Sequence, residues 1–192
     1  MRKGWIVHPS SQRRFGHSVT ELHRLVKAHP RTTDLRALLT ELCNAGVEFI
    51  VVGGAAAVIQ GAPITTQDLD IVHSRSPENV HRLLDLLLRL DATMRYELAD
   101  RGLRPTFELL SGRGQINLST SLGPIDPRCE LEDGLDYDQL LPHSEVVNDG
   151  ALALKVLDLP TLISVKTKTG RPKDRLVLPI LIATLEEREK LK

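Results

Sequence analysis

The sequence has few cysteines, few aromatic side chains and no excess of charge of either sign. Its two cysteines, Cys43 and Cys129, lie far apart, which excludes a disulfide-rich scaffold and a cysteine zinc motif. We expect two ordinary buried thiols in a reducing compartment. Lysine and arginine number 25, as do aspartate and glutamate, so the composition does not indicate a protein that coats nucleic acid or a membrane surface. A local basic patch could still meet nucleic acid.

Long apolar runs are also missing. No segment approaches the roughly 20 apolar residues that a membrane-spanning helix needs. The polar, basic start of the chain lacks the apolar centre of a secretion signal, so we expect a cytoplasmic protein. A length of 192 residues suits one domain, or one domain with a small appendage, and allows a substantial core.

The first 31 residues differ in character from the rest. They hold four of the seven histidines and two prolines, with only a modest apolar pattern. No metal-ligand spacing connects these histidines, and a solvated surface explains them. We interpret residues 1–31 as an N-terminal extension and residues 32–192 as the folded domain, because regular hydrophobic periodicity begins at this boundary.

Helical and strand-like patterns alternate through residues 32–192. Leucines at helical spacing, capping residues and glycine stops predict helices at about 35–45, 55–60, 77–90, 159–169 and from Asp174 to the C-terminus. Strands are expected at 47–52 and 68–73, followed by one hairpin that turns at Gly123-Pro124 and another that turns near Asn148-Asp149-Gly150. Interleaved helices and strands followed by adjacent hairpins predict an α+β domain with a mixed sheet.

Two aspartates interrupt the second predicted strand. Side chains alternate between the faces of a strand, so Asp68 and Asp70 project to one side, about 7 Å apart, while Leu69 and Ile71 point into the core. An ionised carboxylate in a partly buried strand must be paired or bind a metal. Magnesium prefers carboxylate oxygens together with water and substrate phosphates. The pair therefore indicates half of a metal site.

A glycine pair, Gly53-Gly54, ends the first predicted strand. Glycine lets a ligand approach the backbone closely, and the helix that follows would offer free N–H groups to a phosphate. One element would then hold phosphate and the other metal.

The order of a strand, two glycines, 13 residues and DLD resembles the signature of the nucleotidyltransferase superfamily, whose fold is that of DNA polymerase beta. The resemblance runs from about residue 34 to residue 185 and implies a mixed β-sheet flanked by helices. It also implies a third carboxylate on a neighbouring strand. The stretch LSTSLGPID is similar to the hairpin that carries this carboxylate and nominates Asp126, while a competing alignment leaves Asn117 in its place. Pro127 lacks a backbone donor and predicts a sheet edge or a bulge there.

The segment LPTLISVKTKTGRPKD resembles a segment of small nucleotidyltransferase-like proteins, including the toxins of abortive-infection and other toxin–antitoxin pairs. Its four cations within eight residues suit a clamp for a triphosphate or a nucleic-acid backbone. In the alternative interpretation, the lysines merely favour a helix C-terminus and Asp174 merely caps the next helix. The resemblance assigns activity to the positions of Lys166 and Asp174.

The resemblance implies a metal-dependent enzyme that moves a nucleoside monophosphate from a nucleoside triphosphate (NTP) to a hydroxyl acceptor. Two Mg²⁺ ions, or Mn²⁺ in their place, would be held by Asp68, Asp70 and Asp126, and Asp126 would activate the acceptor hydroxyl. Lys166 would steady the triphosphate. The nucleotide-binding set comprises Gly53, Gly54, Lys166, Lys168, Arg171 and Asp174, and Arg104 is more simply a solvated arginine.

The preferred acceptor is RNA, such as tRNA, in a toxin-like enzyme with a cognate antitoxin protein as partner. A small-molecule acceptor such as an antibiotic is an alternative. Two further alternatives are a nucleotide-binding module without catalysis and a subunit that uses the fold to bind a protein partner.

Overall fold

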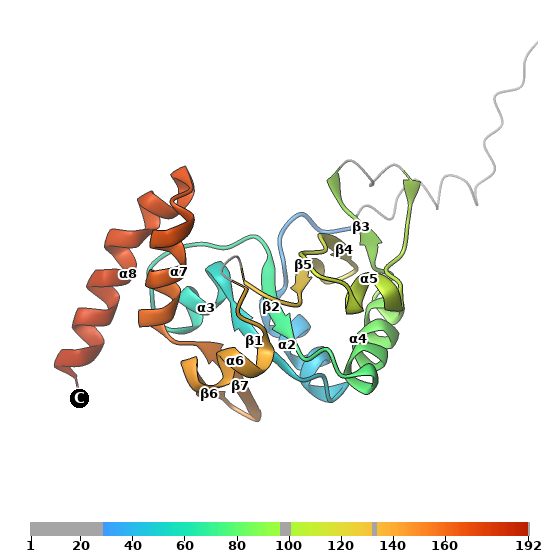
Figure 1. Cartoon of the computed structure of the whole chain (residues 1–192), viewed down its shortest axis with the longest axis horizontal. Helices are drawn as coiled ribbons and strands as arrows, with labels where there is room; N and C mark the ends of the chain where they lie inside the picture. The colour runs from blue at the N-terminus through green and yellow to red at the C-terminus, as the bar shows by residue number, and fades with distance from the viewer. Residues whose placement is uncertain (1–28, 97–100, 132–133, 192) are drawn as a thin grey trace, which may run out of the picture.

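The computed structural model describes residues 29–96, 101–131 and 134–191, which form one mixed sheet with helices around it (Figure 1). Most of the proposed N-terminal extension lies outside these residues, so the boundary at residue 32 stays a prediction. The strands are β1 (Phe49–Val52), β2 (Leu69–His73), β3 (Thr93–Met94), β4 (Leu118–Thr120), β5 (Gly123–Arg128), β6 (Ser144–Asp149) and β7 (Leu152–Leu157). The helices are α2 (Leu35–Asn44), α3 (Gly53–Ile59), α4 (Pro77–Arg89), α5 (Phe107–Ser111), α6 (Tyr137–Leu140), the 3-10 turn η2 (Leu141–His143), α7 (Leu159–Thr169) and α8 (Pro172–Lys190).

The predicted α+β architecture with a mixed sheet is confirmed. The strand order is β3-β4-β5-β2-β1-β7-β6, with β2 parallel to β5, β1 parallel to β7 and the other neighbours antiparallel. Figure 1 shows α7 and α8 at one end of the molecule and α4 and α5 at the other. Among the described residues, no helix is both long enough and apolar enough to cross a membrane.

Helix starts follow the predicted capping residues. The carboxylate of Asp34 accepts a hydrogen bond from the Ala37 N–H and opens α2, and Ser76 does the same for α4, whose first residue is proline. The faces of α2 and α4 that carry leucines are buried in the core. The sequence therefore places these helices correctly to within one or two residues.

The first hairpin forms, but its turn was predicted two residues too late. The turn lies at residues 121–122, and Gly123 and Pro124 already belong to β5. The hydroxyl of Thr120 donates to the Gly123 carbonyl at 2.7 Å, which closes the turn early. Gly123, at φ +106°, is needed for a different reason: a Cβ there would lie 2.5 Å from the Cα of Thr33.

Pro127 lies in the interior of the sheet, so the prediction of an edge is wrong. Strand β5 sits between β4 and β2, and the register that pairs Leu118 with Ile125 continues without a bulge to the bridge between Gln115 and Arg128. The Ile116 N–H donates to the Pro127 carbonyl at 2.9 Å, and the proline returns no bond. The missing donor explains why β4 begins only at Leu118.

The C-terminal helices meet at a tight turn. Gly170, at φ +58°, ends α7 as predicted, because a left-handed residue commonly closes a helix. Helix α8 begins at Pro172, two residues earlier than expected, with Arg171 rather than Asp174 at the N-cap position. Asp174 is buried in the first turn of α8 and binds side chains of α7 instead, so the prediction that it caps the helix is wrong.

Both cysteines carry free thiols. Cys129 is buried, as predicted, and its sulfur donates to the Leu110 carbonyl, while Cys43 is only half-buried in α2. Burial raises the pKa of each thiol.

Candidate active site

Asp68 and Asp70 lie on one face of the sheet, as their spacing predicted. Leu69 and Ile71, on the opposite face, are fully buried. The side chain of Asp68 is 35% exposed and that of Asp70 is 17% exposed, and both border the same cavity. The Thr66 hydroxyl donates to the Asp68 carbonyl at 3.0 Å, which orders the entry to β2.

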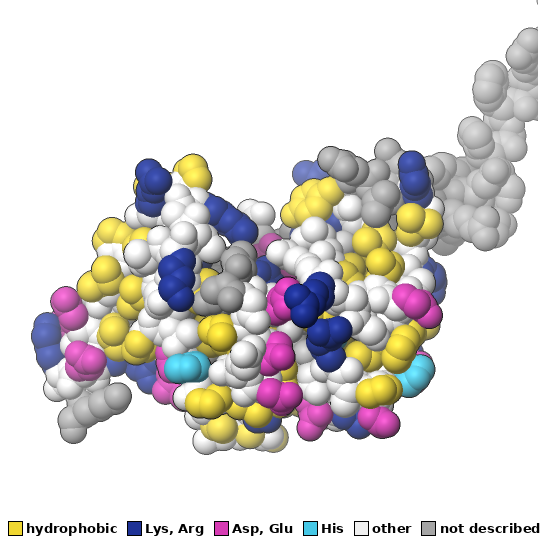
Figure 2. All heavy atoms as spheres, viewed as in Figure 1, with side chains coloured by type: hydrophobic (Ala, Val, Ile, Leu, Met, Phe, Trp, Pro, Cys, Tyr) yellow, Lys and Arg dark blue, Asp and Glu magenta, His cyan; other side chains and the backbone are white. Residues whose placement is uncertain are grey.

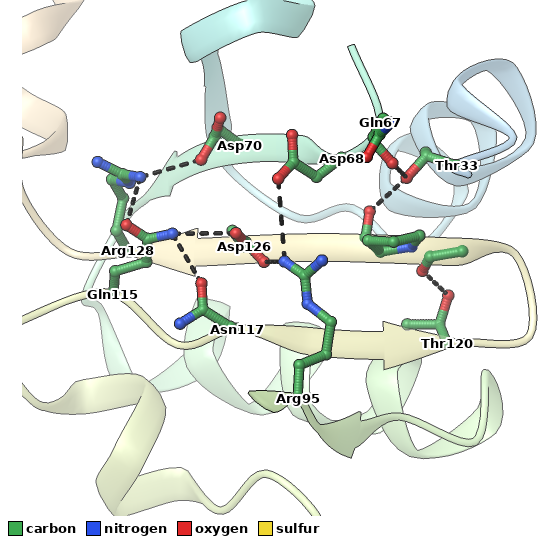
Figure 3. A network of polar contacts seen from close by, with 12 residues as sticks. Thr33, Gln67, Asp68, Asp70, Arg95, Gln115, Asn117, Thr120, Asp126 and Arg128 are labelled. Carbon is green, nitrogen blue, oxygen red and sulfur yellow. Dashed lines mark hydrogen bonds and ion pairs between the residues drawn. The ribbon is translucent and has the colours of Figure 1, made fainter. Parts of the chain in front are cut away.

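Asp126 joins this pair through the parallel alignment of β2 and β5. The register sets Asp126 directly beside Asp70, on neighbouring strands that run in the same direction. Figure 3 shows the three carboxylates on the same face of the two strands. The same guanidinium nitrogen of Arg95 bonds to Asp126 and lies 4.0 Å from a carboxylate oxygen of Asp68, so Arg95 bridges these two acids. The structure thus brings together three acids that are up to 58 residues apart in the chain.

Asn117 also borders the cavity, but it lies one strand farther from the pair. Its side-chain oxygen accepts a hydrogen bond from Gln115 at 2.9 Å. Asp126, and not Asn117, lies directly beside Asp70, and this geometry favours Asp126 for the third position of the proposed site.

Two arginines face the three carboxylates. Arg128 donates to Asp70 at 2.9 Å and to the side-chain oxygen of Gln115 at 2.6 Å, while Arg95 bonds to Asp126. The Gln115 amide donates to the second oxygen of Asp126 at 2.9 Å. Three negative charges therefore meet two positive charges on one largely buried sheet face (Figure 3).

The carboxyl groups of this face ionise less readily than free ones. The pKa of Asp126 is raised to about 6, chiefly by burial and to a lesser extent by the charges of Asp70 and Asp68, against the attraction of Arg95. Burial likewise raises the pKa of Asp70, while Arg128 opposes the shift. A carboxylate with a pKa near neutrality can exchange a proton at physiological pH.

This shift predicts a pH dependence of stability. Because the folded form of Asp126 holds its proton up to about pH 6 while the unfolded form loses it near 3.8, the contribution of this group to stability falls as the pH rises between these values. We expect the unfolding free energy of the protein, relative to Asp126→Asn, to fall by about 2 kcal/mol between pH 4 and pH 7. Arg95 stays charged over this whole pH range. Loss of its ion pair in Asp126→Asn therefore changes the difference in unfolding free energy between the two proteins by an amount that does not depend on pH.

Denaturant unfolding with a chelator present measures this difference at each pH. A difference that stays flat, or that rises with pH, would show that Asp126 is not held in a desolvated site.

The cavity lies between this sheet face and the junction of α7 and α8. It has a volume of about 400 Å³ and is also lined by Gly53, Gly54, Lys166, Thr169, Arg171, Lys173 and Asp174. Figure 2 shows a hollow between the end formed by α7 and α8 and the part that carries β3 and β4, with basic side chains on its rim. Three of the four predicted cations thus reach the cavity. Lys168 is not among the lining residues.

Lys166, which is half-buried, and Asp174, which is buried, form an ion pair on the α-helical wall. The lysine ammonium donates to Asp174 at 2.7 Å, and the Thr169 hydroxyl donates to the other carboxylate oxygen at 2.9 Å. Burial by itself would raise the pKa of Asp174, but the bonds from Lys166 and Thr169 outweigh it and lower the pKa. Asp174 therefore positions Lys166 at the cavity wall.

The comparisons with known proteins address the fold. No protein-family model matches the sequence, and no curated protein matches it. Among solved structures, that of the lincosamide antibiotic adenylyltransferase LnuA with lincomycin bound matches with a TM-score of 0.55, over 81% of this chain and 99% of that one, at 11% sequence identity. The protein has the nucleotidyltransferase fold. A Thermotoga maritima protein provisionally named as a nucleotidyltransferase, TM1012, matches with a TM-score of 0.49 at 18% identity, covering 90% of this chain and 99% of its own.

The nucleotidyltransferase fold confirms the resemblance drawn from the GG and DLD motifs at the level of architecture. In this fold the three acids offer the oxygen ligands that Mg²⁺ prefers, so their chemistry fits a magnesium site. The three carboxylates are not arranged closely enough to form a complete metal site: among the described residues, no three His, Cys, Asp or Glu side chains form a group that could hold a metal ion. Asp126 could bind a metal only after Arg95 releases its carboxylate.

Arg95, Gln115 and Arg128 are the site residues that the sequence analysis missed. Arg128 follows Asp126 by two residues and so shares its face of β5, a signal that alternation alone could have supplied. Arg95 follows a strand of two residues, and Gln115 precedes β4, so no periodic pattern marks either of them. Arg104, by contrast, pairs with Asp91 and does not line the cavity, in keeping with a solvated arginine.

Proposed function

We propose that the protein is a metal-dependent nucleotidyltransferase that moves a nucleoside monophosphate from an NTP to a hydroxyl acceptor. The observation that carries the proposal is the meeting of Asp68, Asp70 and Asp126 on one sheet face, beside a cavity that is also lined by the two glycines that open α3 and by cations at the junction of α7 and α8. The nucleotidyltransferase fold supports it at the level of architecture.

Each part of the cavity has a proposed role. Asp68, Asp70 and Asp126 would hold Mg²⁺, or Mn²⁺, which when bound neutralises phosphate charge and favours in-line displacement. Asp126 would also accept the proton of the acceptor hydroxyl, whose oxygen forms the new bond to the α-phosphorus as pyrophosphate leaves. Lys166, together with Arg171, would pair with the triphosphate.

We propose RNA, such as tRNA, as the acceptor, in a toxin-like enzyme with a cognate antitoxin. The segment at residues 159–174 supports this choice, because it resembles small nucleotidyltransferase-like toxins. The likeness to LnuA favours a second candidate, a small-molecule acceptor such as an antibiotic, because nearly the whole of that adenylyltransferase is covered by the match.

The two arginines favour a third candidate, a nucleotide-binding module without catalysis. Arg95 and Arg128 already neutralise two of the three acids. In an active enzyme these contacts must be exchanged for a metal, whereas in an inactive module they are permanent.

Incubation with each labelled NTP, Mg²⁺ and total tRNA separates the candidates. We expect label on RNA with the native protein and none with Asp68→Ala/Asp70→Ala. A parallel incubation in which lincomycin replaces the RNA tests the small-molecule alternative. Magnesium-dependent NTP binding without label on either acceptor would point to the inactive module, and absence of both binding and transfer would contradict the proposal.

A further inference from the structure

Helix α8 presents an apolar face that nothing in the described part of the chain covers. Eight successive residues, 176–183, are apolar, which is more than two turns and therefore surrounds the helix. Only one side packs inward, through buried Leu181 and half-buried Val177 and Leu185. The outward side exposes Leu176 by 78% and Ile182 by 45%.

The exposed residues recur at the spacing of a helix-packing seam. Pro179 follows Leu176 by three residues and is itself followed by Ile182 and Ala183 at three and four residues; all four side chains are exposed. Hydrophobic side chains gather over this end of the molecule in Figure 2. Contiguous exposed apolar residues bordered by charges are typical of a protein–protein contact.

Charge at the two ends of the seam identifies the partner. Arg175 precedes the apolar residues and Glu186 follows them, and both side chains are exposed. If a second α8 lies antiparallel on the first, Arg175 of each copy faces Glu186 of the other. In the same register Pro179 of each copy faces Ile182 of the other, so apolar residues also meet apolar residues.

We propose that α8 is the contact surface of a homodimer in which the α8 helices of two copies pack antiparallel about a two-fold axis. Such a contact uses one patch twice and must be complementary to itself, which the order of cation, apolar residues and anion provides. Helices of this kind pack at axis separations of about 8–10 Å, close enough for the outward leucines and isoleucines to interdigitate. The proposal does not depend on the enzymatic function.

The molar mass of the full chain in solution tests the proposal. By light scattering over micromolar to hundred-micromolar concentrations, we expect a mass of twice 21.3 kDa for the native protein. Ile182→Glu should weaken dimerisation at least about tenfold, because it places a charge in the apolar contact. Leu109→Glu is the matched control: Leu109 is 46% exposed, much like Ile182, and lies on α5 at the opposite end of the molecule from α8 (Figure 1), so its replacement should leave the mass unchanged.

Charge reversal tests the antiparallel register. Arg175→Glu alone and Glu186→Arg alone should each weaken the dimer, since each opposes two like charges. The chain that carries both substitutions should dimerise again. Circular dichroism and thermal unfolding would show that each variant is folded.

Several outcomes would overturn the proposal. A native protein that stays monomeric at the highest concentration would do so, as would a dimer that persists in folded Ile182→Glu. A double charge-reversal variant that remains monomeric would also overturn it, because it would show that the helices do not meet in this register or that the face binds a different protein.

Discussion

Asp126→Asn is expected to lower the rate of nucleotidyl transfer by about 10³-fold, if transfer proceeds as we propose. Asparagine keeps the size of the side chain but removes the negative charge that would hold a metal and the base that would take the acceptor proton. Its amide can still accept a hydrogen bond from Arg95, so the fold should persist. Rates of label transfer to RNA or a small molecule, measured at saturating NTP, provide the test.

Two control substitutions make the result specific. Asn117→Ala removes the residue that the competing alignment places third, and we expect it to retain most of the activity, because Asn117 adjoins β4 and the whole of β5 lies between β4 and the strand of Asp70. Asp85→Asn removes an exposed carboxylate from α4, outside the cavity, and should change nothing. If Asn117→Ala abolished transfer while Asp126→Asn spared it, the third acid would have been misassigned.

Much of the fold could be predicted because local signals and global packing agree. In α4, for example, the N-cap Ser76, the proline at the first position and the leucine spacing all indicate the same helix. The errors fall where tertiary contacts override a local rule. Pro127 leaves one bond of an interior strand unmade, and the pairing of its neighbours with β2 on one side and β4 on the other holds it in the sheet.

The candidate site was predictable only in part, for a related reason. Asp68 and Asp70 share a strand, so alternation alone puts them on one face. Their meeting with Asp126 depends on the pairing of β2 with β5, which only the resemblance to a known family suggested. Arg95 reaches the site because it directly follows β3, a short strand at the edge of the sheet, and sequence spacing does not predict where such a strand lies.

Gly53→Ala should damage both stability and activity. Gly53 has a φ of +64°, a left-handed conformation that disfavours alanine by about 1–2 kcal/mol. A Cβ there would also lie 2.9 Å from the carboxyl carbon of Asp70 and closer still to one of its oxygens. The carboxylate of Asp70 must then move, and a displacement of this kind in a proposed metal ligand should lower the transfer rate by at least about 10²-fold.

Gly61→Ala is a control that separates the effect of backbone strain from the effect of displacing Asp70. Gly61 has a φ of +93°, so alanine is disfavoured there as well, but a Cβ at Gly61 would meet no atom within 4 Å. We expect both variants to lose about 1–2 kcal/mol of unfolding free energy from backbone strain, while only Gly53→Ala loses transfer activity. Denaturant unfolding and transfer rates, measured on the same preparations, give both quantities. Equal loss of activity in the two variants would mean that backbone strain alone explains the effect, and that the close approach of Gly53 to Asp70 has no part in the chemistry.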